Sequence, residues 1–561
     1  MNKIIVVLGI IMISISTFAQ TIPFKIQKSE LFKDEYKESH IVLSEEDGNG
    51  GVLIVRSYER SFSGKRGYYI EHYDSNLKLI KEFDYELKHT GTQKYKFELG
   101  VFTMLDNLNI IQVFYDINER AYICLAHCIN KNDLNTTQKE LFRFTREEIK
   151  QYGNFDLSES FFKSFRNDSF LNGDFSSKGN RNTFSLNPFN SKHDTSSSFG
   201  NNSGIAIVIN KDKNAFSIGI DFNGKKAETL KLYLFDDKLN KKNDLTYSKE
   251  IKDSKYIFQN INLSKDGNSI YLLSKSFTPN QKSKEKGGKY QFEITKFNQD
   301  KEVTNTFETE EHFIGSLKTI TEEDRLICCG FYSDINDSKY KGICYFKLDA
   351  NSLTLLKTKY NPFSEQFMID KYGEEKDKEL KYLTFKNYLF TKDNELLFNA
   401  QEEYSVTSNN TAIGVNSMFI NNGSRTYFNY GDIVTVKLSI DGDLVWARNI
   451  NKKQAYQYDE DESYVSYTAS IVEDMPYYFI NGGKKIKQLD NNRIEFEDSN
   501  KNKSNLYLIR IKNNGEFEFE KVLDDEKNEV PFMVSKGVQL DNSVFFLGSN
   551  GSKKQLLKVT L

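Results

Sequence analysis

The chain has 561 residues and a formal net charge of −3, so no basic field for nucleic acid is present. Hydrophobic residues make up only 38% of the chain, but aromatic residues reach 14%, and Phe and Tyr suit half-buried strands. The six prolines and an ordinary glycine content exclude a collagen-like chain and argue against a wholly disordered one.

The first 19 residues have the pattern of a signal peptide. Lys3 supplies the positive charge, and residues 4–15 are apolar but too short to span a bilayer comfortably. Thr17 and Ala19 are small residues at the positions that a signal peptidase checks, so we expect cleavage before Gln20. A short membrane anchor that stays attached is the alternative. No later stretch is long and apolar enough for a transmembrane helix, so we expect a periplasmic, cell-surface or extracellular protein.

Beyond this segment, one β-hairpin cassette recurs seven times along the chain. In each cassette a strand-like run meets a turn built around Asp, Asn or Gly, and a second β run follows. The cassettes span residues 68–83, 122–142, 230–251, 290–307, 343–360, 433–450 and 506–522. Because repetition at intervals of about 50–60 residues is typical of repeat architectures, the cassette predicts fold rather than chemistry.

Two further β runs precede most cassettes and complete a four-stranded unit. Examples are residues 257–263 followed by 270–277, and residues 314–320 followed by 325–332. Four-stranded units at this spacing predict an all-β fold, a β-propeller of antiparallel blades. We expect one propeller domain over residues 20–561, with insertions at about 146–202 and 405–431.

The two chain ends predict how the ring closes. The C-terminal stretch holds three runs, at 532–539, 543–548 and 555–561, and lacks a fourth. The mature N-terminus offers one, because Ile22, Phe24 and Ile26 alternate with other residues, and Pro23 is tolerated on an outermost strand. Seven complete units and this split unit make eight blades. Seven blades remain the alternative, because the second unit is irregular.

One segment resembles a known repeat. Ser264, Asp266, Gly267, Ile270 and Tyr271 follow the S-x-D-G-x-x-I-Y signature of WD40-like propeller repeats in bacterial envelope proteins. The Phe-Ala-Gln end of the signal segment and the richness in Asn, Lys, Phe and Tyr resemble secreted proteins of Bacteroidota. These resemblances imply a propeller fold and export from the cytoplasm. They assign no functional residue in this chain.

The sequence contains one partial match to a nucleotide-binding motif and one to an acyl-enzyme motif. Residues 48–51 begin like a glycine-rich phosphate loop, but Leu53 replaces the third glycine and no helix is expected, so a turn is favoured. Ser160 and Lys163 match Ser-x-x-Lys, but no Lys-Thr-Gly follows, so a short amphipathic helix is favoured.

Metal and thiol patterns are also weak. The six histidines have no metal-ligand spacing, and the acidic run 459–462 lacks the glycines of a calcium loop. Residues 441–443 are expected to form a hairpin turn. The five cysteines favour buried free thiols, although one cross-strand disulfide between Cys344 and the pair Cys328 and Cys329 is conceivable.

The tyrosine-rich runs are the aromatic residues that could bind a ligand. Trp446 is expected in a blade core, whereas the tyrosine-rich runs 427–430 and 456–458 either line one end of the channel or, as we favour, cover the core edge.

The sequence therefore assigns no catalytic, cofactor-binding or metal-binding residue and implies no cofactor. We expect a binding or interaction scaffold for an unknown protein or glycan, without nucleic acid and without a transmembrane segment in the mature chain. Two alternatives are a hydrolase or lyase that acts on glycans or peptides, with its site in the blade loops, and a structural subunit of a surface assembly.

Overall fold

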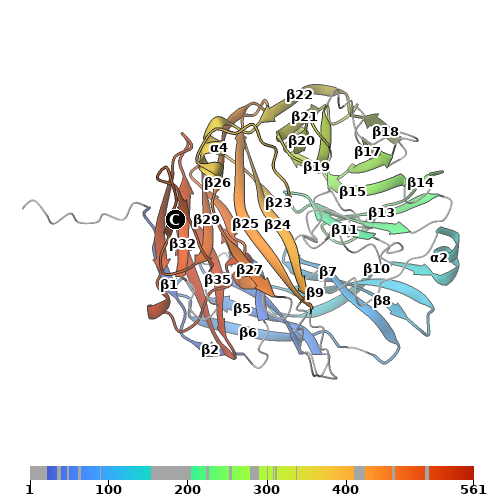
Figure 1. Ribbon diagram of the computed structural model, residues 1–561. Coiled ribbons are helices and arrows are strands. Elements are labelled where there is room, and N and C mark those ends of the chain that lie inside the picture. Colours follow the sequence, from blue (N-terminus) through green and yellow to red (C-terminus); the bar gives the residue numbers. More distant parts are fainter. Residues whose placement is uncertain are drawn as a thin grey trace, which may run out of the picture.

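Eight antiparallel sheets form a β-propeller, shown as a ribbon in Figure 1. This computed structural model describes residues 22–34, 39–46, 50–60, 65–88, 90–152, 204–222, 227–251, 255–277, 290–299, 301–307, 309, 312–336, 338–409, 424–457, 462–498 and 505–561. The expected signal segment, the Ser160–Lys163 match, His89 and His193 lie outside these residues. We number the blades in chain order and call their strands A to D from the innermost outward.

Blades 1 to 4 follow one another in the first half of the chain. Blade 1 consists of β3 (Ser39–Glu46), β4 (Val52–Arg60), β5 (Lys65–Tyr73) and β6 (Leu79–Glu86). Blade 2 consists of β7 (Gln93–Met104), β8 (Asn107–Asp116), β9 (Ala121–Asn130) and β10 (Thr136–Thr145), and the short helix α2 (Arg146–Tyr152) follows it. Blade 3 consists of β11 (Gly204–Ile209), β12 (Ala215–Phe222), β13 (Glu228–Asp236) and β14 (Lys241–Lys249). Blade 4 consists of β15 (Tyr256–Leu263), β16 (Ile270–Phe277), β17 (Tyr290–Asn298) and β18 (Lys301–Thr306).

Blades 5 to 7 carry more elaborate connections. Blade 5 consists of β19 (Phe313–Glu322), β20 (Arg325–Ser333), β21 (Gly342–Leu348) and β22 (Leu355–Pro362), and helix α4 (Glu365–Tyr372) follows it. Blade 6 consists of β23 (Leu383–Phe390), β24 (Leu396–Asn409), β25 (Ser424–Leu438) and β26 (Leu444–Ile450), and β27 (Gln454–Gln457) also pairs with β25. Blade 7 consists of β28 (Thr468–Val472), β29 (Met475–Gly482), β32 (Asn505–Ile511) and β33 (Phe517–Leu523), with the hairpin of β30 (Lys487–Gln488) and β31 (Ile494–Glu495) between its B and C strands. The short 3₁₀ turns are η4 (Glu462–Tyr464), η6 (Asp525–Lys527) and η7 (Val534–Lys536).

Blade 8 closes the ring with strands from both chain ends. Its three inner strands are β34 (Val538–Leu540), β35 (Ser543–Asn550) and β36 (Lys553–Thr560), and its outer edge is formed by β1 (Lys25–Lys28) and β2 (Phe32–Lys33). Figure 1 shows β1 and β2 beside the C-terminal strands. The predicted split blade and the count of eight are confirmed, and the alternative count of seven is wrong. The run 532–539 is a shorter strand than expected, because the turn η7 occupies residues 534–536.

The seven predicted cassettes are the C and D strands of blades 1 to 7. Their turns share one design in several blades, where an Asp or Asn side chain accepts hydrogen bonds from nearby backbone amides. Asp74 accepts from the amides of residues 76 and 78, and Asp349 accepts from those of residues 351 and 352. A leucine with positive φ completes these turns and inserts into the core, as Leu77 and Leu353 do. Gly442 has φ +80° in the turn of blade 6, so the expectation of a hairpin turn at residues 441–443 is also confirmed.

The apolar core consists of separate clusters between neighbouring blades rather than one central cluster. Eight clusters of buried side chains each join two neighbouring blades, and the cluster between blades 8 and 1 completes the circle. Each blade therefore buries both faces only against its neighbours. Cys328 and Cys329 point into different clusters, and all five cysteines are buried free thiols, as favoured from the sequence.

Candidate binding site

The connections at the two ends of the blades differ in length. Because neighbouring strands in a blade are antiparallel, the B–C and D–A connections leave from one end, and the A–B and C–D turns leave from the other. The B–C and D–A connections include the segments 363–382, 451–467 and 483–504, whereas the A–B turns are tight. We call the first end of the propeller the long-connection face and the second the short-turn face.

Ion pairs join the innermost strands of separate blades on the short-turn face. Lys213, in the A–B turn of blade 3, pairs with Glu45 on the innermost strand of blade 1. Lys211, in the same turn, pairs with Glu322 on the innermost strand of blade 5. Each of these lysines therefore reaches past one intervening blade and ties innermost strands together on the short-turn face.

On the long-connection face, α4 is a well-capped helix between blades 5 and 6. The Ser364 side chain accepts a hydrogen bond from the amide of Phe367, and Gly373 ends the helix with φ +81°. Phe367 and Met368 are buried in the cluster between the two blades. The helix is thus held by its apolar side, and its last turn carries the charged residues Asp370 and Lys371.

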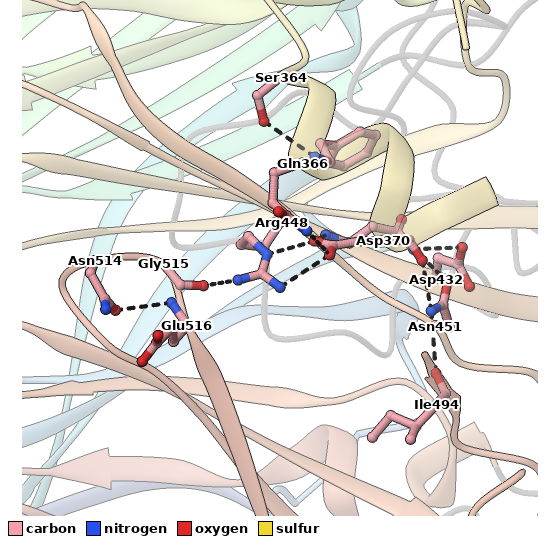
Figure 2. A network of polar contacts seen from close by, with 12 residues as sticks. Ser364, Gln366, Asp370, Asp432, Arg448, Asn451, Ile494, Asn514, Gly515 and Glu516 are labelled. Carbon is pink, nitrogen blue, oxygen red and sulfur yellow. Dashed lines mark hydrogen bonds and ion pairs between the residues drawn. The ribbon is translucent and has the colours of Figure 1, made fainter. Parts of the chain in front are cut away.

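Asp370 fastens α4 to the outer strand of blade 6, as Figure 2 shows. Arg448 Nε lies 2.5 Å and Nη2 lies 3.0 Å from the two carboxylate oxygens of Asp370, a bidentate ion pair with little exposure. Arg448 also donates to the carbonyl of Gly515 in the C–D turn of blade 7. The Asn451 amide donates to the carbonyls of Asp370 and Ile494, which joins blade 7 to the same network.

Lys371, the next residue, lies between two carboxylates from neighbouring strands. Its Nζ is 2.8 Å from Glu402 Oε1 on β24 and 2.7 Å from Asp432 Oδ2 on β25. Burial opposes the charge of Lys371, but the two carboxylates outweigh it and raise its pKa. Burial raises the pKa of Glu402, and the charge of Asp432 adds to the rise while Lys371 offsets part of it. The Glu402 side chain stays 22% exposed, so this group can meet a ligand.

A second lysine, Lys452, is buried next to Lys371, Glu402 and Asp432. Lys452 Nζ donates to the carbonyl of Tyr430 at 3.1 Å and to Gln454 Oε1 at 2.6 Å. Burial lowers the pKa of Lys452 to about 7, against the attraction of Asp498 and other carboxylates. The position of Lys452 in the interior suits a supporting role rather than direct contact with a ligand.

Aromatic rings lie at the exposed edge of the same blade. Tyr382, which precedes β23, and Tyr404, on β24, have ring centroids 5.6 Å apart and are 55% and 38% exposed. Tyr372, at the end of α4, is approached by Lys376 and Lys378, whose Nζ atoms lie 5.4 and 4.9 Å from its ring centroid. We call Lys371, Glu402, Asp432, Tyr382 and Tyr404 the blade 6 site.

The tyrosine-rich runs take a different place from the one considered for a channel lining. Phe428, Tyr430 and Tyr456 are buried together in a small cluster where β25 pairs with β27. They cover the edge of the core, as favoured, and Tyr458 lies outside the described residues. Trp446 is buried between blades 6 and 7, as expected.

The other sequence patterns supply no further site. Of residues 48–51, only Gly50 and Gly51 are described, and they lie between β3 and β4, where Gly50 has φ +80°. Of the acidic run 459–462 only Glu462 is described, and it accepts a hydrogen bond from Tyr456. Over the ranges given above, no three His, Cys, Asp or Glu side chains are grouped as metal ligands. Likewise, no helix among the described residues is long and apolar enough to cross a membrane.

Sequence reasoning missed the blade 6 site, because its residues come from three separate segments. Lys371, Glu402 and Asp432 lie about 30 residues apart along the chain and match no motif. The fold brings them together because Glu402 lies opposite Leu383 at the start of β23, and Asp432 lies at the register shift between β24 and β25, where the end of α4 meets both strands.

The fold and this site define a β-propeller with an elaborated long-connection face. No family model and no curated protein matches the sequence. Among solved structures, the β-propeller domain of the Trilobed protease from Pyrococcus furiosus is similar at 9% identity, with 88% of this chain and 97% of that one covered and a TM-score of 0.33. An acylaminoacyl peptidase from Pyrococcus horikoshii is similar at 9% identity and a TM-score of 0.32, with 81% of this chain covered and about half (49%) of that chain. A Synechocystis apocarotenoid oxygenase mutant is similar at 7% identity, with 96% and 94% covered and a TM-score of 0.31. At these values the similarities carry no argument about function.

Proposed function

We propose that this protein is an exported binding scaffold that holds its ligand on the long-connection face, at the blade 6 site. On the short-turn face, Lys211 and Lys213 are engaged in ion pairs with Glu322 and Glu45. The observation that supports the proposal most directly lies on the long-connection face, where Glu402 pairs with Lys371 and stays 22% exposed. There the Asp370–Arg448 pair holds α4 in place, so the partly exposed Glu402 and its partners are pre-organised.

Export is the part of this proposal that comes from the N-terminal segment. Cell fractionation of the native host, followed by mass determination of the purified chain, tests it. The proposal expects the protein outside the cytoplasm with Gln20 as its first residue. A cytoplasmic protein that begins at Met1 would contradict export and leave the binding site untouched.

Binding is tested by passing the purified protein over immobilised glycans and peptides and measuring retention and turnover together. We expect saturable retention of one ligand class without turnover. Replacing Lys371 by Met is expected to weaken retention about tenfold or more, since a loss of about 1.4 kcal/mol corresponds to a factor of ten. Arg143→Met, which changes an exposed ion pair on blade 2, is the matched control and should leave retention unchanged.

A hydrolase or lyase is a second candidate, and one observation favours it. Glu402 and Asp432 share Lys371, and Glu402 has a raised pKa, as a proton donor requires. Robust turnover of a glycan or peptide that Glu402→Gln abolishes would establish this candidate and reject the pure scaffold.

A further inference from the structure

We infer that the ligand of the blade 6 site is a neutral oligosaccharide, which stacks on the rings of Tyr382 and Tyr404. This inference rests on the proposed function and adds the ligand class to it. Three features of the described residues support it: the exposure of the rings, the backbone that holds one of them, and the charge balance around them.

The exposure of the two rings is unusual among the aromatic residues that the structure describes. Most of these are buried between blades, whereas Tyr382 is 55% and Tyr404 is 38% exposed. Their rings lie side by side at 5.6 Å with an interplanar angle of 39°. Two adjacent aromatic faces with hydroxyl groups at their rims match the apolar C–H faces and polar edges of consecutive sugar rings.

The backbone holds Tyr382 in this place at a cost. Tyr382 has φ +62°, and it is the one aromatic residue with positive φ in the described part of the chain. A bulky residue in the left-handed region is destabilised by about 1 kcal/mol or more, so glycine would suit this position better for folding. The Tyr382 carbonyl accepts a hydrogen bond from the amide of Glu403 at 2.8 Å, which fixes the backbone of Tyr382 beside β24. Leu77 and Leu353 adopt the same region in C–D turns and fill the core, whereas the Tyr382 side chain is exposed.

The surrounding polar groups indicate a neutral partner. Glu402 and Asp432 each pair with Lys371, and near Tyr372 Lys376 pairs with Glu374 while Lys378 adds a positive charge. Charges of both signs alternate over a short distance, so neither a polyanion nor a polycation gains from the local field. Carboxylate oxygens accept from sugar hydroxyls and lysine donates to them, which gives hydrogen bonds in both directions.

The test is a panel of neutral α- and β-linked gluco-, galacto-, manno- and xylo-oligosaccharides, followed by calorimetric titration of the best binder. We expect at least one panel member to bind. Tyr404→Ala and Tyr382→Gly should each weaken that binding about tenfold or more. Tyr382→Gly should keep or raise the melting temperature, since it relieves the strain, and a purely structural tyrosine would instead lower it. Phe519→Ala, which removes an aromatic ring that is 37% exposed on blade 7, is the matched control and should bind normally.

Three results would overturn the inference, and only the last of them also overturns the proposed function. If no panel member binds while a peptide is retained in a Lys371-dependent way, the ligand class is wrong and the scaffold stands. If an oligosaccharide binds with unchanged affinity to both tyrosine variants, the stacking site is wrong. If neither glycans nor peptides are retained, both proposals fail together.

Discussion

Gln27 of β1 lies directly opposite Lys558 of β36, although the two residues stand near opposite ends of the chain. This register joins the N-terminal strand to the last one and closes the ring. Without it, β36 would present an unpaired edge to solvent. The closure therefore makes the stability of blade 8 depend on both chain ends.

The register of this closure predicts a specific cross-link. Cysteines introduced as Gln27→Cys and Lys558→Cys lie on paired positions, within the Cα separation that a disulfide requires. On oxidation we expect an intramolecular bond that shifts mobility on a denaturing gel and stabilises the fold by roughly 2–4 kcal/mol. Gln27→Cys with Lys553→Cys, which pairs elsewhere with Lys33, is the control and should not cross-link. Equal cross-linking of both pairs would contradict the register.

Arg56 is predicted to be the most costly single charge to remove. It is fully buried between Asp34, next to the closing strand β2, and Glu71 of blade 1, with Nη1 2.7 Å from Asp34 Oδ2. Arg56→Met leaves two buried carboxylates unpaired, so we expect a loss of about 3–5 kcal/mol in the free energy of unfolding. Arg143→Met removes an exposed ion pair and should cost less than about 1 kcal/mol in the same denaturant titration. Similar losses for the two variants would show that Arg56 is not buried as described.

The lowered pKa of Lys452 predicts that the protein becomes more stable as the pH rises. Its pKa is about 7 in the folded protein, below the ordinary value of 10.5, so the unfolded chain binds more protons between these values. The Lys452 contribution to the free energy of unfolding should therefore rise with pH from about 7 to 10.5 and be lost as pH falls. The slope is at most ~1.4 kcal/mol per pH unit.

The variant Lys452→Met checks this contribution by chemical denaturation across pH 6 to pH 10. We expect the difference between wild type and variant to grow with pH in favour of wild type. Lys453→Met changes the exposed neighbouring lysine and should keep the wild-type slope. Parallel curves for wild type and Lys452→Met would refute the assignment.

Asp370 is predicted to control the order of α4. Asp370→Asn removes the charge that Arg448 pairs with, so we expect a loss of about 2–3 kcal/mol, and faster amide exchange over residues 365–372. Asp441→Asn changes a carboxylate that is 56% exposed in a turn of the same blade, and it should change neither quantity. Unchanged exchange in α4 after Asp370→Asn would mean that its apolar contacts alone hold the helix.

The sequence predicts the fold of this protein well because its strands and turns repeat. The turn leucines and aspartates, such as Leu77 and Asp74, recur in register, and the apolar residues from Ile22 to Ile26 indicate the missing outer strand, although only Ile26 lies within β1. Helix α4 and strand β27 escape prediction, since each occurs once and lies in a connection that does not repeat. Resemblance to a repeat signature supports the propeller, whereas the bacterial envelope origin that it implies stays a prediction.

The blade 6 site could not be predicted for a physical reason. Lys371 becomes significant only when α4 packs against β26 and points it at Glu402 and Asp432. Tyr382 is recognisable only by its φ angle and its exposure, which no local pattern encodes. In the tyrosine-rich run 427–430, Phe428 and Tyr430 are buried as packing, as favoured from the sequence.

The account is tested most directly by hydrogen–deuterium exchange of the whole protein with and without the tightest-binding oligosaccharide of the panel. It predicts protection of backbone amides on the long-connection face of blade 6, over residues 371–383, 401–406 and 427–433. The A–B turns at residues 210–214 and 264–269, on the short-turn face, should exchange at unchanged rates. Protection of those turns, with no change around Glu402, would contradict the placement of the site.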